Sequence, residues 1–205
     1  MMPMFDVQAF ILVGGASRRM GRDKASLRFG RQTGVELITR ALQSVSRSVT
    51  TVGFLKHELD GLPNIPDLRA DWGPLAGIEA ALQHTITSTA LIVGCDFPFV
   101  TAELFGRLLK NLDEADAVVP LQSDGRIQPL CAVYKAGACL PAALAAINAG
   151  EHSPRALLER VPTLYLPFAE FSHFSNSEHF FFNVNTPENY ERALAILNEG
   201  QNRER

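Results

Sequence analysis

The chain has 205 residues, of which 46% are hydrophobic, and this is enough for one buried core within the usual single-domain limit of about 250 residues. Its formal net charge of -3 and the lack of a basic, aromatic-laced stripe argue against a nucleic-acid partner. Without a run of ~20 apolar residues, a signal-peptide pattern or a Cys-x-x-Cys pair, we expect neither a membrane partner nor a disulfide framework, but one cytoplasmic domain over residues 1–205 with its core at about 8–198.

The first half of the chain alternates short apolar strands with helical segments. Strands are predicted at residues 9–13, 49–54 and 91–94, and helices at 35–46 and 75–83. This alternation predicts βαβ units, and therefore a parallel sheet with helices on both faces. Ligands of such sheets bind at the carboxyl ends of the strands, so we expect the chemistry there.

The second half departs from this alternation. A helix is predicted at 101–112 with Thr101 as its N-cap, followed by a strand at 117–120. The turn residues 123–126 lie between extended segments, which predicts a hairpin and makes the sheet mixed. The remaining predicted elements are helices at 136–148, 154 to about 160 and 187–197, and a strand at 161–166.

Several residues in the second half have the chemistry of helix ends. Gly150 is expected to end the helix at 136–148, and Ser153 to cap the next one. Pro187 is suited to the first turn of the terminal helix, with Asn185 or Thr186 as its cap. Together the elements predict an α/β fold of three layers, with a mostly parallel, mixed sheet and helices on both faces.

A glycine-rich, cationic loop follows the first predicted strand. Gly14 and Gly15 let the backbone turn sharply, and successive N–H groups in such a turn can point at phosphate oxygens. Four cations against one carboxylate give the loop a charge of +3, which predicts a binding site for a nucleotide triphosphate. The charged residues are Arg18, Arg19, Arg22 and Lys24, against Asp23.

The spacing in this loop distinguishes it from two commoner phosphate-binding loops. It has neither the Gly-Lys-Ser/Thr of the phosphate loop nor the three glycines of the dinucleotide fingerprint. Residues 12–24 instead resemble the signature Leu-x-Gly-Gly-x-Ser-x-Arg-Met-Gly-x-Asp-Lys of the nucleotidyltransferases, in particular the molybdenum cofactor guanylyltransferases. The resemblance implies the Rossmann-like nucleotidyltransferase fold. The alternative is a surface turn with scattered arginines.

A carboxylate follows the strand predicted at 91–94. Pro98 forbids continuation of a central strand, so Asp96 is expected to point into the crevice at the strand end. A carboxylate there suits Mg²⁺, which takes one or two carboxylates besides water and phosphate oxygens. In the family this position holds the metal, and the resemblance gives Asp96 that role. The alternative is that Asp96 only caps the following helix.

A second segment similar to the family lies on the nucleotide side. Residues 73–77, Gly-Pro-Leu-Ala-Gly, resemble a turn that leads into a helix facing the nucleotide. Alignment on this segment makes Asp67, rather than Asp71, the match of the family aspartate that is associated with the nucleotide. Asp71 is then an ordinary solvated charge.

Two positions depart from the family pattern. Gly53 stands where members often have a polar residue, commonly asparagine, and Val13 stands where alanine is usual. Both departures bear on base selectivity and leave phosphate and metal binding untouched. The nucleotide-binding residues implied by the resemblance are Leu12, Val13, Gly14, Gly15, Ser17, Arg18, Lys24, Gly53, Asp67, Gly77 and Asp96.

The acceptor side is indicated by the segment at 182–188, which resembles the molybdenum cofactor enzymes. Asn183 and Asn185 fall on one side of an extended segment, so both amides can face a polar heterocycle. Asn185 alternatively only caps the terminal helix. Arg155 lies in a second segment similar to the family, where it would meet an anionic acceptor, although taken alone it is a surface arginine.

The resemblance implies transfer of GMP from Mg-GTP to the phosphate of molybdenum-molybdopterin. Arg19 and Lys24 would hold the leaving phosphates, and Asp96 would place Mg²⁺; these are the expected catalytic residues. Other molybdenum cofactor biosynthesis or molybdoenzyme-maturation proteins are candidate partners. The alternatives are a relative that uses CTP or a sugar phosphate, and a non-catalytic nucleotide-binding module.

Overall fold

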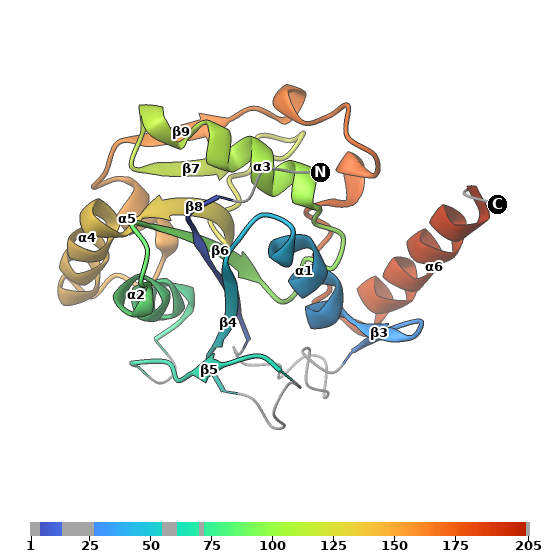
Figure 1. Ribbon diagram of the computed structural model, residues 1–205, viewed down its shortest axis with the longest axis horizontal. Helices are drawn as coiled ribbons and strands as arrows, with labels where there is room; N and C mark the ends of the chain where they lie inside the picture. The colour runs from blue at the N-terminus through green and yellow to red at the C-terminus, as the bar shows by residue number, and fades with distance from the viewer. Residues whose placement is uncertain (1–4, 14–26, 55–60, 70–71, 204–205) are drawn as a thin grey trace.

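A computed structural model describes residues 5–13, 27–54, 61–69 and 72–203 of the chain. Its centre is a seven-stranded sheet in the order β5-β4-β1-β6-β8-β7-β9 (Figure 1). A separate two-stranded hairpin joins β2 and β3. The strands are β1 (Gln8–Leu12), β2 (Arg28–Phe29), β3 (Gln32–Thr33), β4 (Ser48–Val52), β5 (Asn64–Ile65), β6 (Thr89–Gly94), β7 (Ala117–Pro120), β8 (Cys131–Lys135) and β9 (Thr163–Leu166).

The sheet is mixed, as the turn chemistry at residues 123–126 predicts. β1 runs parallel to both β4 and β6. β8 is antiparallel to β6 and to β7, and β9 returns parallel to β7. The antiparallel β8 follows from the tight turn after β7, because a hairpin reverses the chain whereas a βαβ crossover does not.

Helices cover both faces of the sheet, which confirms the three-layer prediction (Figure 1). One core contains side chains of α1 and α3, and the other contains side chains of α2, α4 and α5. α6 extends to one side, where its first turns pack against the β2–β3 hairpin. The helices are α1 (Gly34–Gln43), α2 (Pro74–His84), α3 (Ala102–Lys110), α4 (Ala136–Asn148), α5 (Pro154–Leu158) and α6 (Pro187–Arg203).

The helix caps follow the sequence with one exception. Ser153 caps α5 by accepting from the amide of Arg155, and Thr186 caps α6 by accepting from the amide of Asn189 at 3.2 Å. Of the two cap candidates for α6, the structure therefore selects Thr186. Thr101 occupies the N-cap position of α3, but its hydroxyl is buried and makes no hydrogen bond to any described residue.

Three short strands were not predicted. β2, β3 and β5 have two residues each, and two residues cannot display an alternating pattern.

Among the described helices, none combines the length and the apolar character needed to span a membrane.

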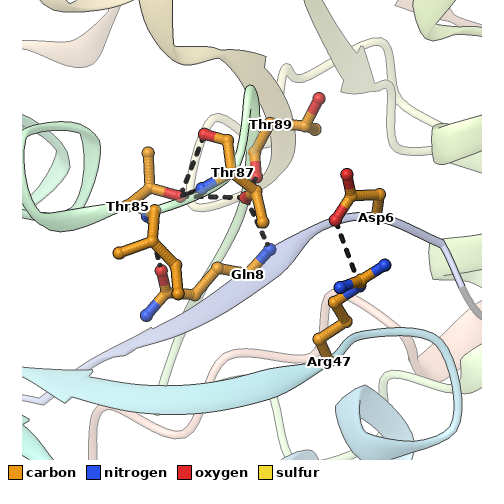
Figure 2. Close-up of polar contacts among 7 residues, drawn as sticks. Asp6, Gln8, Arg47, Thr85, Thr87 and Thr89 are labelled. Atoms are coloured by element: carbon orange, nitrogen blue, oxygen red, sulfur yellow. Dashed lines mark hydrogen bonds and ion pairs between the residues drawn. The ribbon is translucent and has the colours of Figure 1, made fainter.

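Polar side chains secure the amino end of β1. The side-chain amide of Gln8 donates to Thr50 at 3.3 Å, and its oxygen accepts from the backbone N–H of Ile86 at 3.0 Å. The backbone N–H of Gln8 donates to the hydroxyl of Thr87, which in turn donates to the carbonyl of Thr89 (Figure 2). These bonds tie β1 to both neighbouring strands, so they help to fix the position of its opposite, carboxyl end.

Candidate active site

Three parallel strands end side by side at the predicted ligand-binding edge. Leu12 at the end of β1 is in register with Val52 of β4 and with Gly94 of β6. The predicted phosphate loop begins two residues after Leu12 and lies outside the described residues. The roles predicted for that loop therefore stay predictions; they concern Gly14, Gly15, Ser17, Arg18, Arg19 and Lys24.

The glycine at position 53 has a physical cause. Gly53 has a φ of +119°, and a Cβ added there would lie 1.9 Å from the carbonyl oxygen of Val13. With this backbone no side chain fits, so the close approach of the chain after β1 excludes the asparagine expected from the family pattern. The same Cβ position would lie 3.5 Å from Oδ2 of Asp67. The structure thus brings together three predicted nucleotide-side residues.

Asp67 carries a perturbed carboxyl group at this edge. Partial burial of this carboxyl raises its pKa above the ordinary value of 3.8. Burial disfavours the charged form, because protein atoms replace part of the water that would solvate it. A carboxylate that lacks part of its hydration gains more from a ligand that donates hydrogen bonds.

Gly77 lies in the first turns of α2 and contacts Leu12. A Cβ at position 77 would lie 3.2 Å from Cδ1 of Leu12, which is tighter than ordinary contact. Gly77 therefore lets α2 pack closely against the end of β1. Both residues were predicted to bind the nucleotide, and the structure places them in contact beside the strand ends.

Asp96 lies two residues beyond β6, and its carboxylate accepts a 2.7 Å hydrogen bond at Oδ2 from the side-chain amide of Asn183. The backbone carbonyl of Asp96 also accepts from the amide of Val184 at 3.0 Å. A Cβ at Gly94 would lie 2.6 Å from Oδ1 of Asp96, so glycine at this position leaves room for the carboxylate. The role of Gly94 could not be predicted from the sequence, because it depends on how the chain turns after β6.

Asn183 is itself held in place and has unused hydrogen-bonding capacity. Its backbone carbonyl accepts from the side chain of Asn189 at 3.1 Å. Its side-chain oxygen is buried and has no partner among the described residues. An amide oxygen can accept two hydrogen bonds, so a donor supplied by a ligand or by water would satisfy it.

The Asp96 carboxylate suits Mg²⁺ that is also bound by the phosphates of a ligand. Within the described residues there is no cluster of three or more His, Cys, Asp or Glu side chains that would hold a metal by itself. Mg²⁺ keeps several waters and is commonly bound by one or two carboxylates together with phosphates. A single carboxylate at a strand end, oriented by an amide, meets that requirement.

A polar pocket of about 480 Å³ opens beside Asn183. It brings Asn183 and Asn185 together, as their alternation along the chain predicts. Two cations also line it: Arg126 forms an ion pair with Asp124, and the guanidinium carbon of Arg192 lies 5.2 Å from the ring centroid of Phe182. The lining residues are Phe97, Gln122, Arg126, Gln128, Phe181, Phe182, Asn183, Asn185, Asn189 and Arg192.

Neither cation of this pocket was predicted from the sequence. Asn189 and Arg192 are spaced i, i+3 on α6, so they lie on one face of this helix. The helix begins four residues after Asn183 in the sequence. That spacing was the available signal. Arg126 belongs to the turn between β7 and β8, and only the fold places that turn next to α6.

Arg155 lies elsewhere. It is exposed on α5 and is absent from the described residues that line the pocket. The loop before α5 instead meets the loop before α2, where the rings of Trp72 and His152 lie 4.3 Å apart. His152 Nδ1 also lies 2.9 Å from the carbonyl oxygen of Trp72. The structure therefore does not place Arg155 in the pocket lined by the two asparagines with which it was predicted to act.

The strand order and the helices on both faces define an α/β fold with a carboxylate at the ends of its strands, and solved structures that share this fold include nucleotidyltransferases. The 2-C-methyl-D-erythritol 4-phosphate cytidylyltransferase of Thermus thermophilus has the same fold, with a TM-score of 0.70 at 17% identity over 95% of this chain and 100% of that one. The molybdopterin-guanine dinucleotide biosynthesis protein A of Archaeoglobus fulgidus superposes with a TM-score of 0.78 at 27% identity, over 94% of this chain and 99% of that one.

Sequence comparison narrows the class to a family. Residues 9–164 match the family described as MobA-like NTP transferase domain. A probable molybdenum cofactor guanylyltransferase of Pelotomaculum thermopropionicum is 34% identical over 195 residues, covering 94% of each chain. The molybdenum cofactor guanylyltransferase of Rhizobium meliloti is 33% identical over 214 residues, covering 96% of this chain and 94% of that one. The chain belongs to the MobA-like NTP transferase family.

Proposed function

We propose that the chain transfers GMP from GTP to the phosphate of molybdenum-bound molybdopterin, giving the guanine dinucleotide cofactor and pyrophosphate. The observation that carries this proposal is the hydrogen bond between Asn183 and Asp96. It joins the strand-end carboxylate on the nucleotide side to the polar pocket on the other side. The names of the relatives supply the identity of the two substrates.

The reaction joins two phosphates. An oxygen of the acceptor phosphate attacks the α-phosphorus of GTP, and a new P–O–P bond forms. The bond from the α-phosphorus to the oxygen that bridges to the β-phosphorus breaks, and pyrophosphate leaves with that oxygen and the electron pair. The acceptor is already anionic and needs little base catalysis, so positioning and charge neutralisation supply most of the rate.

The residues divide into roles according to their place at the sheet edge. Arg19 and Lys24 would hold the leaving phosphates, as the family signature implies. Asp96 would hold Mg²⁺, which when bound offsets negative charge on the triphosphate. Asp67 and the backbone at Gly53 would contact the nucleoside, because both lie beside the end of β1.

On the acceptor side, Asn183 and Asn185 would contact the pterin, and the two arginines of the pocket would face its anionic groups. The role predicted for Arg155 remains a proposal that competes with these arginines. We also propose a cytoplasmic location, and other proteins of molybdenum cofactor biosynthesis as candidate partners.

A relative that uses CTP is the alternative, since Gly53 offers the base only backbone groups. The deciding experiment measures pyrophosphate release with GTP, CTP, ATP and UTP, each with and without molybdenum-molybdopterin. We expect release with GTP only when both the acceptor and Mg²⁺ are present. Faster pyrophosphate release with CTP than with GTP would show that CTP is the substrate. A protein that binds GTP but releases no pyrophosphate with any acceptor would be a binding module.

A further inference from the structure

One buried carboxylate has no part in the chemistry described above. Glu79 lies on α2 and is only 2% exposed. A buried carboxylate is costly unless it is paired and hydrogen-bonded. Its partner is Arg69, which donates from Nε to Oε2 at 2.9 Å and from Nη2 to Oε1 at 3.1 Å. This two-bond geometry fixes the guanidinium in orientation as well as in distance.

Arg69 belongs to the same short segment as Asp67. The start of that segment is fixed to the sheet by two backbone hydrogen bonds. The amide of Thr51 donates to the carbonyl of Pro63 at 2.8 Å, and the amide of Gly53 donates to the carbonyl of Ile65 at 2.9 Å. The Arg69 side chain fixes the other end of the segment to α2. Asp67 therefore lies between two anchors, one provided by the sheet and one by a helix.

We propose that Glu79 is a positioning residue for the nucleotide, acting through Arg69 to hold the Asp67 carboxylate beside Gly53. The proposal rests on the proposed function, since it takes Asp67 as a nucleotide contact. It gives a role to a charged pair at a position where α2 otherwise buries apolar side chains. An apolar pair of similar size would fill the space without holding the segment in one orientation.

The test uses a paired variant, because removing one partner alone would leave a buried charge unpaired. Arg69→Met with Glu79→Met removes both charges and keeps unbranched side chains, of which the second is close to glutamate in length. Mg-GTP affinity is measured by titration calorimetry, KM and kcat by pyrophosphate release, and folding by thermal melting. We expect a several-fold loss of GTP affinity that appears in KM, with kcat nearly unchanged. Should the paired variant fail to fold, Glu79→Gln keeps one acceptor for Arg69 and is expected to give a smaller loss.

A cycle with Asp67 separates positioning from general damage. Asp67→Asn alone is expected to lower GTP affinity about tenfold or more, which is the effect of losing one charge-assisted hydrogen bond. If Glu79 acts through Asp67, the paired change adds little further loss in the Asp67→Asn background. Fully additive losses, or a folded paired variant with unchanged GTP affinity, would overturn the proposal.

An exposed ion pair provides the matched control. Arg47 and Asp6 pair at 3.1 Å with side chains 68% and 70% exposed, at the opposite end of the sheet (Figure 2). Arg47→Met with Asp6→Asn is expected to leave GTP affinity unchanged. Failure of this inference is distinguishable from failure of the proposed function, because the latter appears in the unaltered protein as a lack of GTP-dependent pyrophosphate release. If Asp67→Asn does not lower GTP affinity, the proposed positioning role is wrong, whereas the proposed transferase reaction is unaffected.

Discussion

The side-chain amide of Asn183 donates a 2.7 Å hydrogen bond to the carboxylate of Asp96, although the two residues are 87 positions apart in the chain. This bond fixes the orientation of the strand-end carboxylate from the side of the polar pocket. An amide is suited to the task because it donates a hydrogen bond without adding a positive charge that would compete with a metal. The two substrate sites of the proposed reaction therefore meet at this pair.

Asp96→Ala is expected to abolish transfer and to leave the fold intact. The carboxylate is half-buried and lies outside the apolar cores, so its loss removes the proposed anchor of Mg²⁺ and not packing. Pyrophosphate release over a range of Mg²⁺ concentrations measures the first effect, and circular dichroism the second. Full Mg²⁺-dependent activity in the folded variant would remove Asp96 from the metal site.

Asn183→Ala is expected to lower transfer and to weaken molybdopterin binding more than GTP binding. The variant loses its bond to Asp96 and its proposed contact with the acceptor, and each lost partner costs about 1–3 kcal/mol. Affinities for GTP and for molybdopterin are measured separately on the folded protein. Lost GTP affinity with normal pterin binding would place this segment on the nucleotide side.

Gly53→Ala is expected to weaken GTP binding and to destabilise the protein by about 1–3 kcal/mol, the usual cost of overpacking. The new Cβ would meet the carbonyl oxygen of Val13 at 1.9 Å, so the chain at the end of β1 must move. Gly150→Ala is the control, since Gly150 also has a positive φ, +80°, but open space around its Cβ position. Urea unfolding and GTP titration of both variants decide the matter; equal effects would leave only backbone strain as the cause.

The sequence predicted the central architecture because its signals are local. Apolar runs mark β1, β4 and β6, and the turn chemistry after β7 predicts the antiparallel β8. The contact of Asn183 with Asp96 has no local signal, since it depends on how the chain after η5 (Ser177–His179) returns to the end of β6. Likewise, the sequence alone presents Gly53 as a departure from the expected family pattern, and only the packed chain shows that the carbonyl of Val13 requires a glycine there.

Asp67→Asn is expected to stabilise the protein at neutral pH while weakening GTP binding. Burial raises the folded-state pKa of Asp67 above 3.8, so as pH rises the unfolded chain loses its proton first and ionisation favours unfolding. The penalty is absent below pH about 3, develops between the unfolded and folded pKa values, and persists at pH 7. Urea unfolding at pH 3 and pH 7 measures it.

Asp124 provides a control of opposite sign. Hydrogen bonds from Arg126 lower the pKa of its carboxyl, so its ionised form favours the folded state. Asp124→Asn is therefore expected to lose stability at pH 7 relative to pH 3. A stability gain at pH 7 for both variants would point to a general effect of reducing the negative charge and not to the burial of Asp67.

Arg192→Gln is expected to weaken binding of the acceptor and to leave binding of the nucleotide unchanged. Arg192 lines the polar pocket beside Asn183, whereas Arg155, the cation indicated by family resemblance, lies on α5 outside that lining. A charge-assisted contact to an anionic group contributes about 1.5–3 kcal/mol, so molybdopterin affinity is expected to fall about tenfold or more in Arg192→Gln. Arg155→Gln is the matched comparison, because both arginines are exposed helix residues and the substitution is the same. Titration with molybdopterin and with Mg-GTP distinguishes them: a loss of acceptor affinity confined to Arg155→Gln would place the acceptor near α5 and assign the polar pocket to another ligand.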